Sequence, residues 1–304
     1  MMRKRLRRLV GVDRLSRYLR KRYTGWEGHE PFLRGHFYSP LPDLAEVARD
    51  RERVFSDDRT DLPGIDLGLD RQAALLSELA RDFDSFDWPA EARPDRRFRV
   101  DNGSICLPDA LVLRGMLRRY RPGRVIEVGS GHSSALMLDV AEREMDRSPA
   151  FTFIDPYPQR LRSVLRADDG GRCEVIEKRV QDVGVGLFDT LGRGDVLFID
   201  SSHVSRAGSD VNFLFFEVLP RLAEGVVVHV HDIGWPFEYQ ESWVMEGRAF
   251  NEAYLLRAFL QFNERFRVLL FLDQIRRQRG EWLRRAAPRM LEGIPGSVWL
   301  ERVG

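Results

Sequence analysis

The sequence predicts a doubly wound α/β fold, in which a mostly parallel sheet is covered by helices on both faces. After about residue 105, short stretches of β-branched and apolar residues alternate with longer stretches that have helical spacing. This is the pattern of repeated β-α-β units. Two of the apolar stretches end in Asp and His, "DVLFIDSSHV" at 195–204 and "VVVHVHDIGW" at 226–235. Such sheets bind ligands beyond the carboxyl ends of their strands, so these ends predict a functional site.

The predicted elements follow one another in order along the chain. The stretch "RQAALLSELARDF" at 71–83 has apolar residues at i, i+3 and i+4, which predicts an amphipathic helix. Further helices are predicted at 109–120, 134–145, 157–167, 186–192, 210–222 and 251–266. Short apolar runs predict strands at 124–129, 150–155, 173–180, 195–200, 225–232, 267–272 and 297–303.

The N-terminal third differs from the rest in composition and spacing. Residues 1–23 carry ten Arg or Lys against one Asp, with apolar residues at roughly helical spacing. Such a basic helix either docks on its own domain or is a tail, or it makes peripheral contact with an anionic membrane or polyanion. We predict that residues 1–100 form this helix and a helical cap or lid, and that residues 101–304 form the main domain.

Composition restricts the class of protein. The formal net charge is +1, which gives no global electrostatic reason to expect nucleic acid as a partner. The two cysteines, Cys106 and Cys173, fit neither a disulfide framework nor a zinc pattern. No apolar stretch approaches the roughly 20 residues of a membrane span, and the N-terminus lacks the apolar region of a signal peptide. We therefore expect a cytoplasmic protein.

A glycine-containing loop follows the first predicted strand in "VIEVGSGHSS". Gly129 and Gly131 let the backbone turn tightly and approach a ligand, and the next helix offers free N–H donors. A dinucleotide fingerprint would have a third glycine where this chain has Ser134. The loop therefore predicts a nucleotide-type ligand but weakens the case for a pyrophosphate.

Two later strands end in residues that suit a nucleoside. The second ends "FIDPYP", with Asp155 placed 24 positions after Gly131, where a carboxylate accepts both hydroxyls of a ribose. The alternative is that Asp155 caps the following helix. After the third strand, Gln181 and Asp182 of "VQDV" are in reach of an adenine edge.

This order of motifs resembles the class I S-adenosylmethionine-dependent methyltransferases. The motifs are "VIEVGSG", "FIDPYP", "VQDV" and "DVLFIDSSH". The stretches "GSDVNFLFFEVLPRL", "HVHDIGWPFEY" and "GRAFNEAYLLRAFLQFN" resemble the methyltransferase-24-type branch, over roughly residues 35–275. The resemblance implies a Rossmann-like methyltransferase fold, with a seven-stranded sheet whose last strand runs antiparallel.

The resemblance also implies which residues bind the cofactor. Its amino-acid portion, its ribose and its adenine would contact Glu127, Gly129, Ser130, Gly131, His132, Ser133, Asp155, Gln181, Asp182 and Asp200. Many relatives carry Glu where this chain has Asp155. Either carboxylate can bridge two hydroxyls, so we expect the shorter side chain to serve.

The polar strand ends have a second implied role. In the relatives that use a divalent metal, the ligands follow the fourth and fifth strands, which here correspond to Asp200, His231 and Asp232. The ion would be Mg²⁺, although a histidine ligand favours Mn²⁺, Fe²⁺ or Zn²⁺. The metal-free alternative is a general base, His203 or His231, oriented by Asp200 or Asp232. A purely structural role as helix caps is the third interpretation.

Aromatic residues and acids alternate just beyond this cluster, and Trp235 and Glu238 are the predicted acceptor contacts. The predicted function is O-methylation of a small hydroxylated molecule of sugar, polyketide or phenol type. One alternative is an iron-linked, hydroxylase-like enzyme on the same scaffold. The other is a non-catalytic module that attaches to a membrane or polyanion through residues 1–23. Relatives of this kind are often homo-oligomers, which we also expect here.

Overall fold

The computed structural model describes residues 32, 34–56, 58–91 and 93–304. The chain divides into two compact units, Met1–Arg49 and Asp50–Gly304. The first contains the helix α2 (Leu44–Arg49), and the predicted basic helix at 1–23 lies outside the described residues. Within the described ranges, no helix combines the length and apolar character needed to cross a membrane.

The second unit is built on one sheet of seven strands in the order β3-β2-β1-β4-β5-β7-β6. The strands are β1 (Arg124–Val128), β2 (Ala150–Ile154), β3 (Cys173–Ile176), β4 (Val196–Ile199), β5 (Val227–Val230), β6 (Phe266–Phe271) and β7 (Val298–Arg302). The first five run parallel, and β7 is antiparallel to both β5 and β6. The predicted doubly wound, seven-stranded fold is confirmed.

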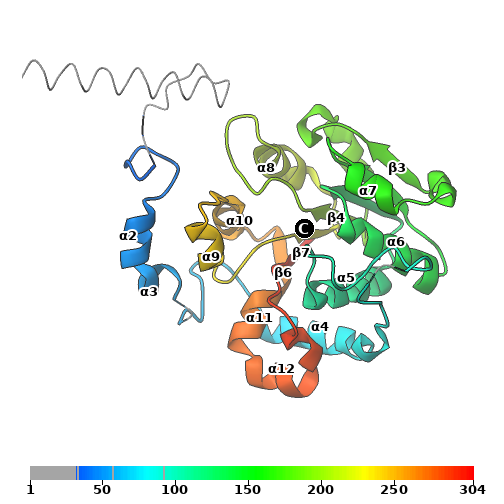
Figure 1. Ribbon diagram of the computed structural model, residues 1–304, viewed down its shortest axis with the longest axis horizontal. Helices are drawn as coiled ribbons and strands as arrows, with labels where there is room; N and C mark the ends of the chain where they lie inside the picture. The colour runs from blue at the N-terminus through cyan, green and yellow to red at the C-terminus, as the bar shows by residue number, and fades with distance from the viewer. Residues whose placement is uncertain (1–31, 33, 57, 92) are drawn as a thin grey trace, which may run out of the picture. The chain divides into compact units, whose positions relative to one another are not determined.

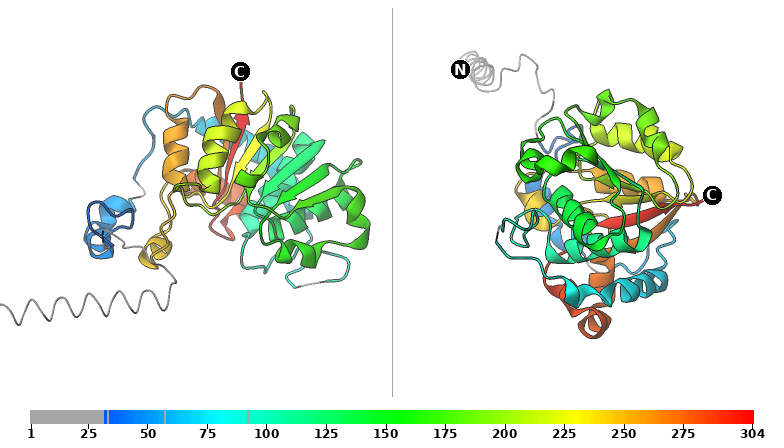
Figure 2. Two further views of the ribbon diagram at one scale, coloured as in Figure 1. Left: turned by 90° about the horizontal axis from the view of Figure 1, so that it is seen from above. Right: turned by 90° about the vertical axis from the view of Figure 1, so that its right-hand side faces the viewer.

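Successive side chains of the strands enter two separate cores, one on each face of the sheet. On one face Val125, Phe153 and Phe198 pack with α4, α5, α6, α11 and α12. On the other, Ile126 and Leu197 pack with α8 and α10. Figure 1 shows these two sets of helices on opposite sides of the central strands, and Figure 2 shows the layers from two further sides. Both faces are covered, as the apolar strand runs predicted.

The helices of this unit have the following bounds: α3 (Arg51–Val54), α4 (Leu69–Ala80), α5 (Leu107–Tyr120), α6 (His132–Glu144), α7 (Gln159–Val164), α8 (Asp210–Phe213), α9 (Glu241–Met245), α10 (Glu252–Leu260), α11 (Leu272–Gln278) and α12 (Gly280–Ala286). The predicted helix at 210–222 continues from α8 through a π-helical turn and a 3₁₀ turn. Pro220 lies in that last turn. Because proline has no N–H, the α-helical hydrogen bonding does not continue there. The sequence analysis did not predict α11 and α12, whose frequent arginines weaken the apolar spacing.

Apolar residues between Leu62 and Phe98 pack with the sheet. The sequence predicted residues 1–100 as a basic helix and a helical cap or lid, with a boundary at residue 100. In the structure, Leu76 and Phe98 are buried in the same core as the strands and α5. The buried amide of Gln72 on α4 donates to Gln274 and accepts from the backbone N–H of Phe271. The apolar face of α4 thus covers the sheet, which is why this segment belongs to the unit of Asp50–Gly304.

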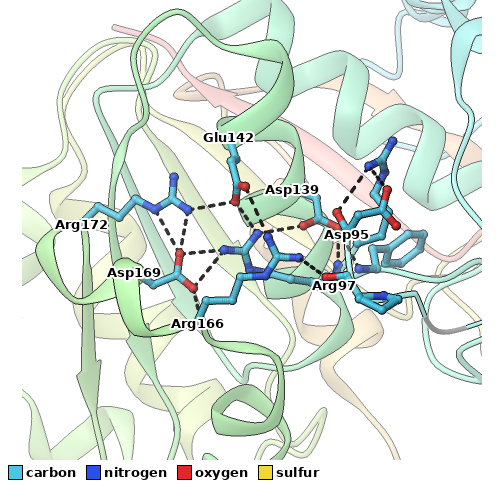
Figure 3. Close-up of polar contacts among 10 residues, drawn as sticks. Asp95, Arg97, Asp139, Glu142, Arg166, Asp169 and Arg172 are labelled. Carbon is cyan, nitrogen blue, oxygen red and sulfur yellow. Dashed lines mark hydrogen bonds and ion pairs between the residues drawn. The ribbon is translucent and has the colours of Figure 1, made fainter.

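A buried arginine holds this segment against α6 (Figure 3). The guanidinium of Arg97 lies 2.9 Å from Asp139 on α6 and 2.9 Å from Asp169, which precedes β3. The Arg97 and Asp139 side chains are each 1% exposed. The second carboxylate oxygen of Asp139 accepts the backbone N–H groups of Arg97 and Phe98. One charged side chain therefore connects three segments that are distant in sequence.

We predict that Arg97→Met lowers the free energy of unfolding by about 3 to 5 kcal/mol, because it leaves buried carboxylates without their partner. Urea denaturation followed by circular dichroism measures the change. The matched control is Arg162→Met, which removes an ion pair with Glu177 whose side chains are 60% and 48% exposed; such pairs contribute about 0 to 1 kcal/mol. Equal effects of the two substitutions would contradict a structural role for the Arg97 network.

Candidate active site at the carboxyl ends of the strands

The loop after β1 touches the end of β4. Gly129 has φ +80°, in the left-handed region, and a Cβ built on it would lie 1.8 Å from the carbonyl oxygen of Asp200. Only glycine permits this approach. The predicted glycine loop and the predicted catalytic Asp200 are therefore brought together by backbone contact.

A buried carboxylate holds the start of α6. Glu127 is 0% exposed and accepts hydrogen bonds from the hydroxyls of Ser133 and Ser134. Burial raises the pKa of Glu127 to about 8, against the opposing effect of the two hydroxyls. The Ser134 hydroxyl also accepts the N–H of Gly131, at 2.9 Å. Ser134, which replaces the third glycine of a dinucleotide fingerprint, thus has a structural role of its own.

A cavity of about 630 Å³ lies at this edge of the sheet. The direction of the strand order reverses between β1 and β4. Open α/β sheets bind ligands at such a switch point. Four of the predicted cofactor residues line it, namely Gly129, Asp155, Gln181 and Asp200. The wall on the other side is formed by the segment that follows β4, residues 201–202 and 206–210.

Asp155 stands beside the glycine loop. One carboxylate oxygen accepts the backbone N–H and the hydroxyl of Ser130, both at 3.0 Å, and the other accepts the N–H of Tyr157. The oxygen that accepts from Tyr157 keeps a lone pair for a ligand in the cavity, whereas the other already accepts two hydrogen bonds. Gln181 also lines the cavity, and its amide donates to the carbonyl of Gly208.

The carboxylate of Asp182 forms an ion pair with Arg179, and both side chains are largely exposed. Arg179 lines the cavity, whereas Asp182 is not among the lining residues.

Two arginines, Arg99 and Arg160, lie close to the start of α6. Burial lowers the pKa of His132, and the guanidinium groups of Arg160 and Arg99 lower it further. A Cβ built on Gly131 would lie 2.6 Å from Cδ of Arg160, so the arginine stem covers the glycine loop. His132 therefore lies in a positively charged environment at the edge of the predicted cofactor site.

Three side chains converge at the ends of β4 and β5. The Nε2 atom of His203 lies 3.4 Å from Asp200 and 3.5 Å from Asp232. One ligand atom from each of the three lies within 4.8 Å of the others. His203 and Asp232 have φ angles of 59° and 58°, so the backbone turns sharply soon after β4 and again soon after β5. Asp200 belongs to this cluster and also lines the cavity.

A fourth residue, Glu252, contacts His203 of this three-residue cluster. Its carboxylate lies 2.8 Å from Nδ1 of His203 and is 0% exposed. Burial alone would lower the pKa of His203, but the hydrogen bonds with Asp200 and Glu252 raise it well above its usual value. The sequence analysis did not predict Glu252, which is 49 positions away from His203. The available signal was an acid at the start of an otherwise apolar amphipathic helix.

His231 lies beside this cluster. Its Nδ1 atom is 3.2 Å from Nε2 of the buried His229, and its Nε2 atom is 3.8 Å from Asp232. Burial opposes protonation of His231, but the carboxylates of Asp200 and Asp232 raise its pKa. Of the metal ligands expected from the sequence, Asp200 and Asp232 lie in the three-residue cluster, where His203 is the third member in place of His231.

The two predicted acceptor contacts have unlike positions. Trp235 is 2% exposed and packs edge-on against Phe271, within the core. Glu238 is partly buried and accepts from the hydroxyl of Tyr254. The ring of Phe250 lies 5.1 Å from that of His203, and the rings of Tyr239 and Trp243 pack against Phe250.

The cluster of Asp200, His203 and Asp232 fits a divalent cation. Two ligand atoms each about 2.1 Å from an ion lie about 3.0 to 3.4 Å apart at octahedral or tetrahedral angles. The observed 3.4 and 3.5 Å around Nε2 of His203 are close to that spacing. They are longer than charge-assisted hydrogen bonds, which are about 2.7 to 2.9 Å. Two carboxylates and an imidazole form a mixed oxygen and nitrogen set.

Comparison with known proteins shows similarity to methyltransferases. A family model described as a methyltransferase domain matches residues 126–233. An uncharacterized protein of Archaeoglobus fulgidus is 35% identical over 166 residues, which cover 53% of this chain and 73% of that protein.

Two solved structures are similar at low identity. The O-methyltransferase TomG of Streptomyces achromogenes is 15% identical with a TM-score of 0.43, covering 86% of this chain and 97% of that one. The methyltransferase PaMTH1 of Podospora anserina is 16% identical with a TM-score of 0.45, covering 88% and 99%.

We predict that the buried carboxyl of Glu127 makes the protein less stable as the pH rises. Its pKa is about 8 when folded against 4.5 as the ordinary value, so between those values the unfolded chain releases a proton that the folded chain keeps. The stability contributed by this group is complete below about pH 4.5 and is lost as the pH rises through about 8.

Glu127→Gln should therefore show a flatter dependence of unfolding free energy on pH, measured by urea denaturation between pH 5 and pH 8. The control is Glu174→Gln, at an exposed position of β3, which should keep the slope of the unsubstituted protein. Identical slopes for all three proteins would show that Glu127 is already ionised in the folded state.

Proposed function

We propose an activity for this chain, which belongs to the methyltransferase family found above: it transfers a methyl group from S-adenosylmethionine to an oxygen of a small hydroxylated molecule. The resemblance stated from the sequence is confirmed by the family match over residues 126–233. The single observation that carries the proposal is the double position of Asp200, which lines the cavity and belongs to the polar cluster. A donor in the cavity and an acceptor at the cluster would meet at this residue.

The cavity supplies the donor side. S-adenosylmethionine, when bound, supplies the methyl group on its sulfonium. The carboxylate of Asp155 would accept from a ribose hydroxyl through the oxygen that keeps a lone pair. The backbone around Gly129 would admit the amino-acid portion, and the N–H groups at the start of α6 would bind its carboxylate.

The cluster supplies the acceptor side. A divalent cation held by Asp200, His203 and Asp232 would act as a Lewis acid toward an acceptor hydroxyl. One carboxylate oxygen of Asp232 would hold the cation and the other would take the hydroxyl proton. The ring of Phe250, 5.1 Å from that of His203, and the ring of Trp243, which packs against Phe250, suit an acceptor with apolar faces, such as a phenol, polyketide or sugar.

Binding of S-adenosylhomocysteine, measured calorimetrically in EDTA, tests the donor side. We expect Asp155→Asn to weaken binding about 10- to 100-fold, because a hydrogen bond to a charged group contributes about 1.5 to 3 kcal/mol. The control Asp189→Asn, at an exposed position outside the cavity, should bind as the unsubstituted protein does. Absence of binding to the unsubstituted protein would overturn the proposed function.

Transfer of a radiolabelled methyl group to a panel of phenols, sugars and polyketides tests the acceptor side. We expect Asp232→Asn to keep its affinity for S-adenosylhomocysteine and to lose about 100-fold or more in rate, as removal of a general base does. Full activity of that variant would contradict the role of Asp232. Oxygen-dependent turnover by an iron-loaded protein that transfers no methyl group would favour the iron-linked alternative.

A further inference from the structure

Glu252 holds His203 at two points. Its carboxylate lies 2.8 Å from Nδ1 of the imidazole, and its backbone N–H donates to the carbonyl of His203, at 3.2 Å. The neighbouring Asn251 also donates to that carbonyl, and its side chain bonds both backbone groups of Ser205. The start of α10 therefore fixes the backbone and the ring of His203 together, in a left-handed conformation that this residue does not prefer.

The ring orientation follows from these contacts. A carboxylate only accepts hydrogen bonds, so the Nδ1 atom of His203 carries the hydrogen that faces Glu252. An imidazole that binds a metal is neutral, and its lone pair then lies on Nε2, which faces Asp200 and Asp232. Histidines that bind metals in proteins are usually oriented in this way by a carboxylate on the other nitrogen.

Nothing else described in the structure explains why the acid is buried here. Glu252 is 0% exposed, and its Oε1 atom has no hydrogen-bond partner. A buried carboxylate without full compensation destabilises the folded protein, so its position at the first turn of an apolar helix indicates a functional role. Among the described residues, the hydrogen-bond partner of its side chain is His203.

We propose that Glu252 is a positioning residue that presents Nε2 of His203 as a nitrogen ligand, so that the cluster of Asp200, His203 and Asp232 selects a cation that accepts nitrogen, such as Mn²⁺, over Mg²⁺. This inference rests on the proposed function for its catalytic meaning, and it deepens that proposal by naming the metal class. Mg²⁺ prefers oxygen ligands, whereas imidazole suits transition metals. The neighbouring Asn251 holds both backbone groups of Ser205, which lies just before the cavity-lining residues 206–210.

The test is calorimetric titration of the full chain with Mn²⁺ and, separately, with Mg²⁺. We expect Glu252→Ala to weaken Mn²⁺ binding about 10- to 100-fold, the usual effect of removing a residue that orients a ligand. Glu252→Gln, whose amide oxygen still accepts from Nδ1, should lose less. The matched control is Asp195→Asn, which alters a buried carboxylate at the opposite end of β4 that binds the N–H groups of Gly123 and Arg124; its Mn²⁺ affinity should not change.

A second comparison separates positioning from general support of the fold. His203→Asp converts the cluster to oxygen ligands and should lower the ratio of Mn²⁺ to Mg²⁺ affinity about tenfold or more. In that background, Glu252→Ala should cause no further loss of Mn²⁺ affinity, because Glu252 acts through the imidazole. An equal loss in both backgrounds would overturn the inference.

The unsubstituted protein gives a readout that needs no variant to fold. Electron spin echo modulation of its Mn²⁺ complex should show a directly bound imidazole nitrogen, and His203→Asp should remove that signal. A complex without nitrogen coupling, coupling that persists in His203→Asp, or no Mn²⁺ binding would each overturn the inference. Failure of S-adenosylhomocysteine to bind, with the metal results as expected, would overturn the proposed function alone.

Discussion

The candidate site depends on the close approach of two backbone segments, the loop after β1 and the end of β4. The carbonyl oxygen of Asp200 occupies the space that any side chain on Gly129 would need. This contact closes the cavity on one side and places the Asp200 side chain at its edge. The donor and acceptor halves of the proposed reaction therefore share one fixed point, which backbone atoms define.

Buried ionisable groups hold the parts that surround this point. Glu127 holds the start of α6 through two serines, Arg97 holds the segment before α5 against α6, and Glu252 holds the loop after β4. Each group loses its contact with water at a cost in free energy, which its hydrogen bonds offset. Such interactions fix orientation more strictly than apolar packing does, and a site for group transfer requires fixed orientation.

A residue in the left-handed conformation follows each of the strands β4 and β5. These residues are His203 and Asp232, which both have positive φ angles. Such angles are unfavourable for residues other than glycine, and they persist where surrounding contacts determine them. For His203 those contacts come from the start of α10. The strain and its compensation lie on elements far apart in the sequence, and together they bring two carboxylates and an imidazole to one point.

The sequence by itself determined the sheet and its order of elements, because apolar period and glycine placement are local properties that a single stretch displays, and its motifs carried the resemblance to the family. It also determined that Asp200, His203 and Asp232 stand at strand ends. Only the tertiary structure decided that His203 is the third member of the cluster, that Trp235 is a core residue and that Glu252 supports the site. The physical reason is that these outcomes depend on turns and on contacts across 49 positions of chain, which periodicity does not encode.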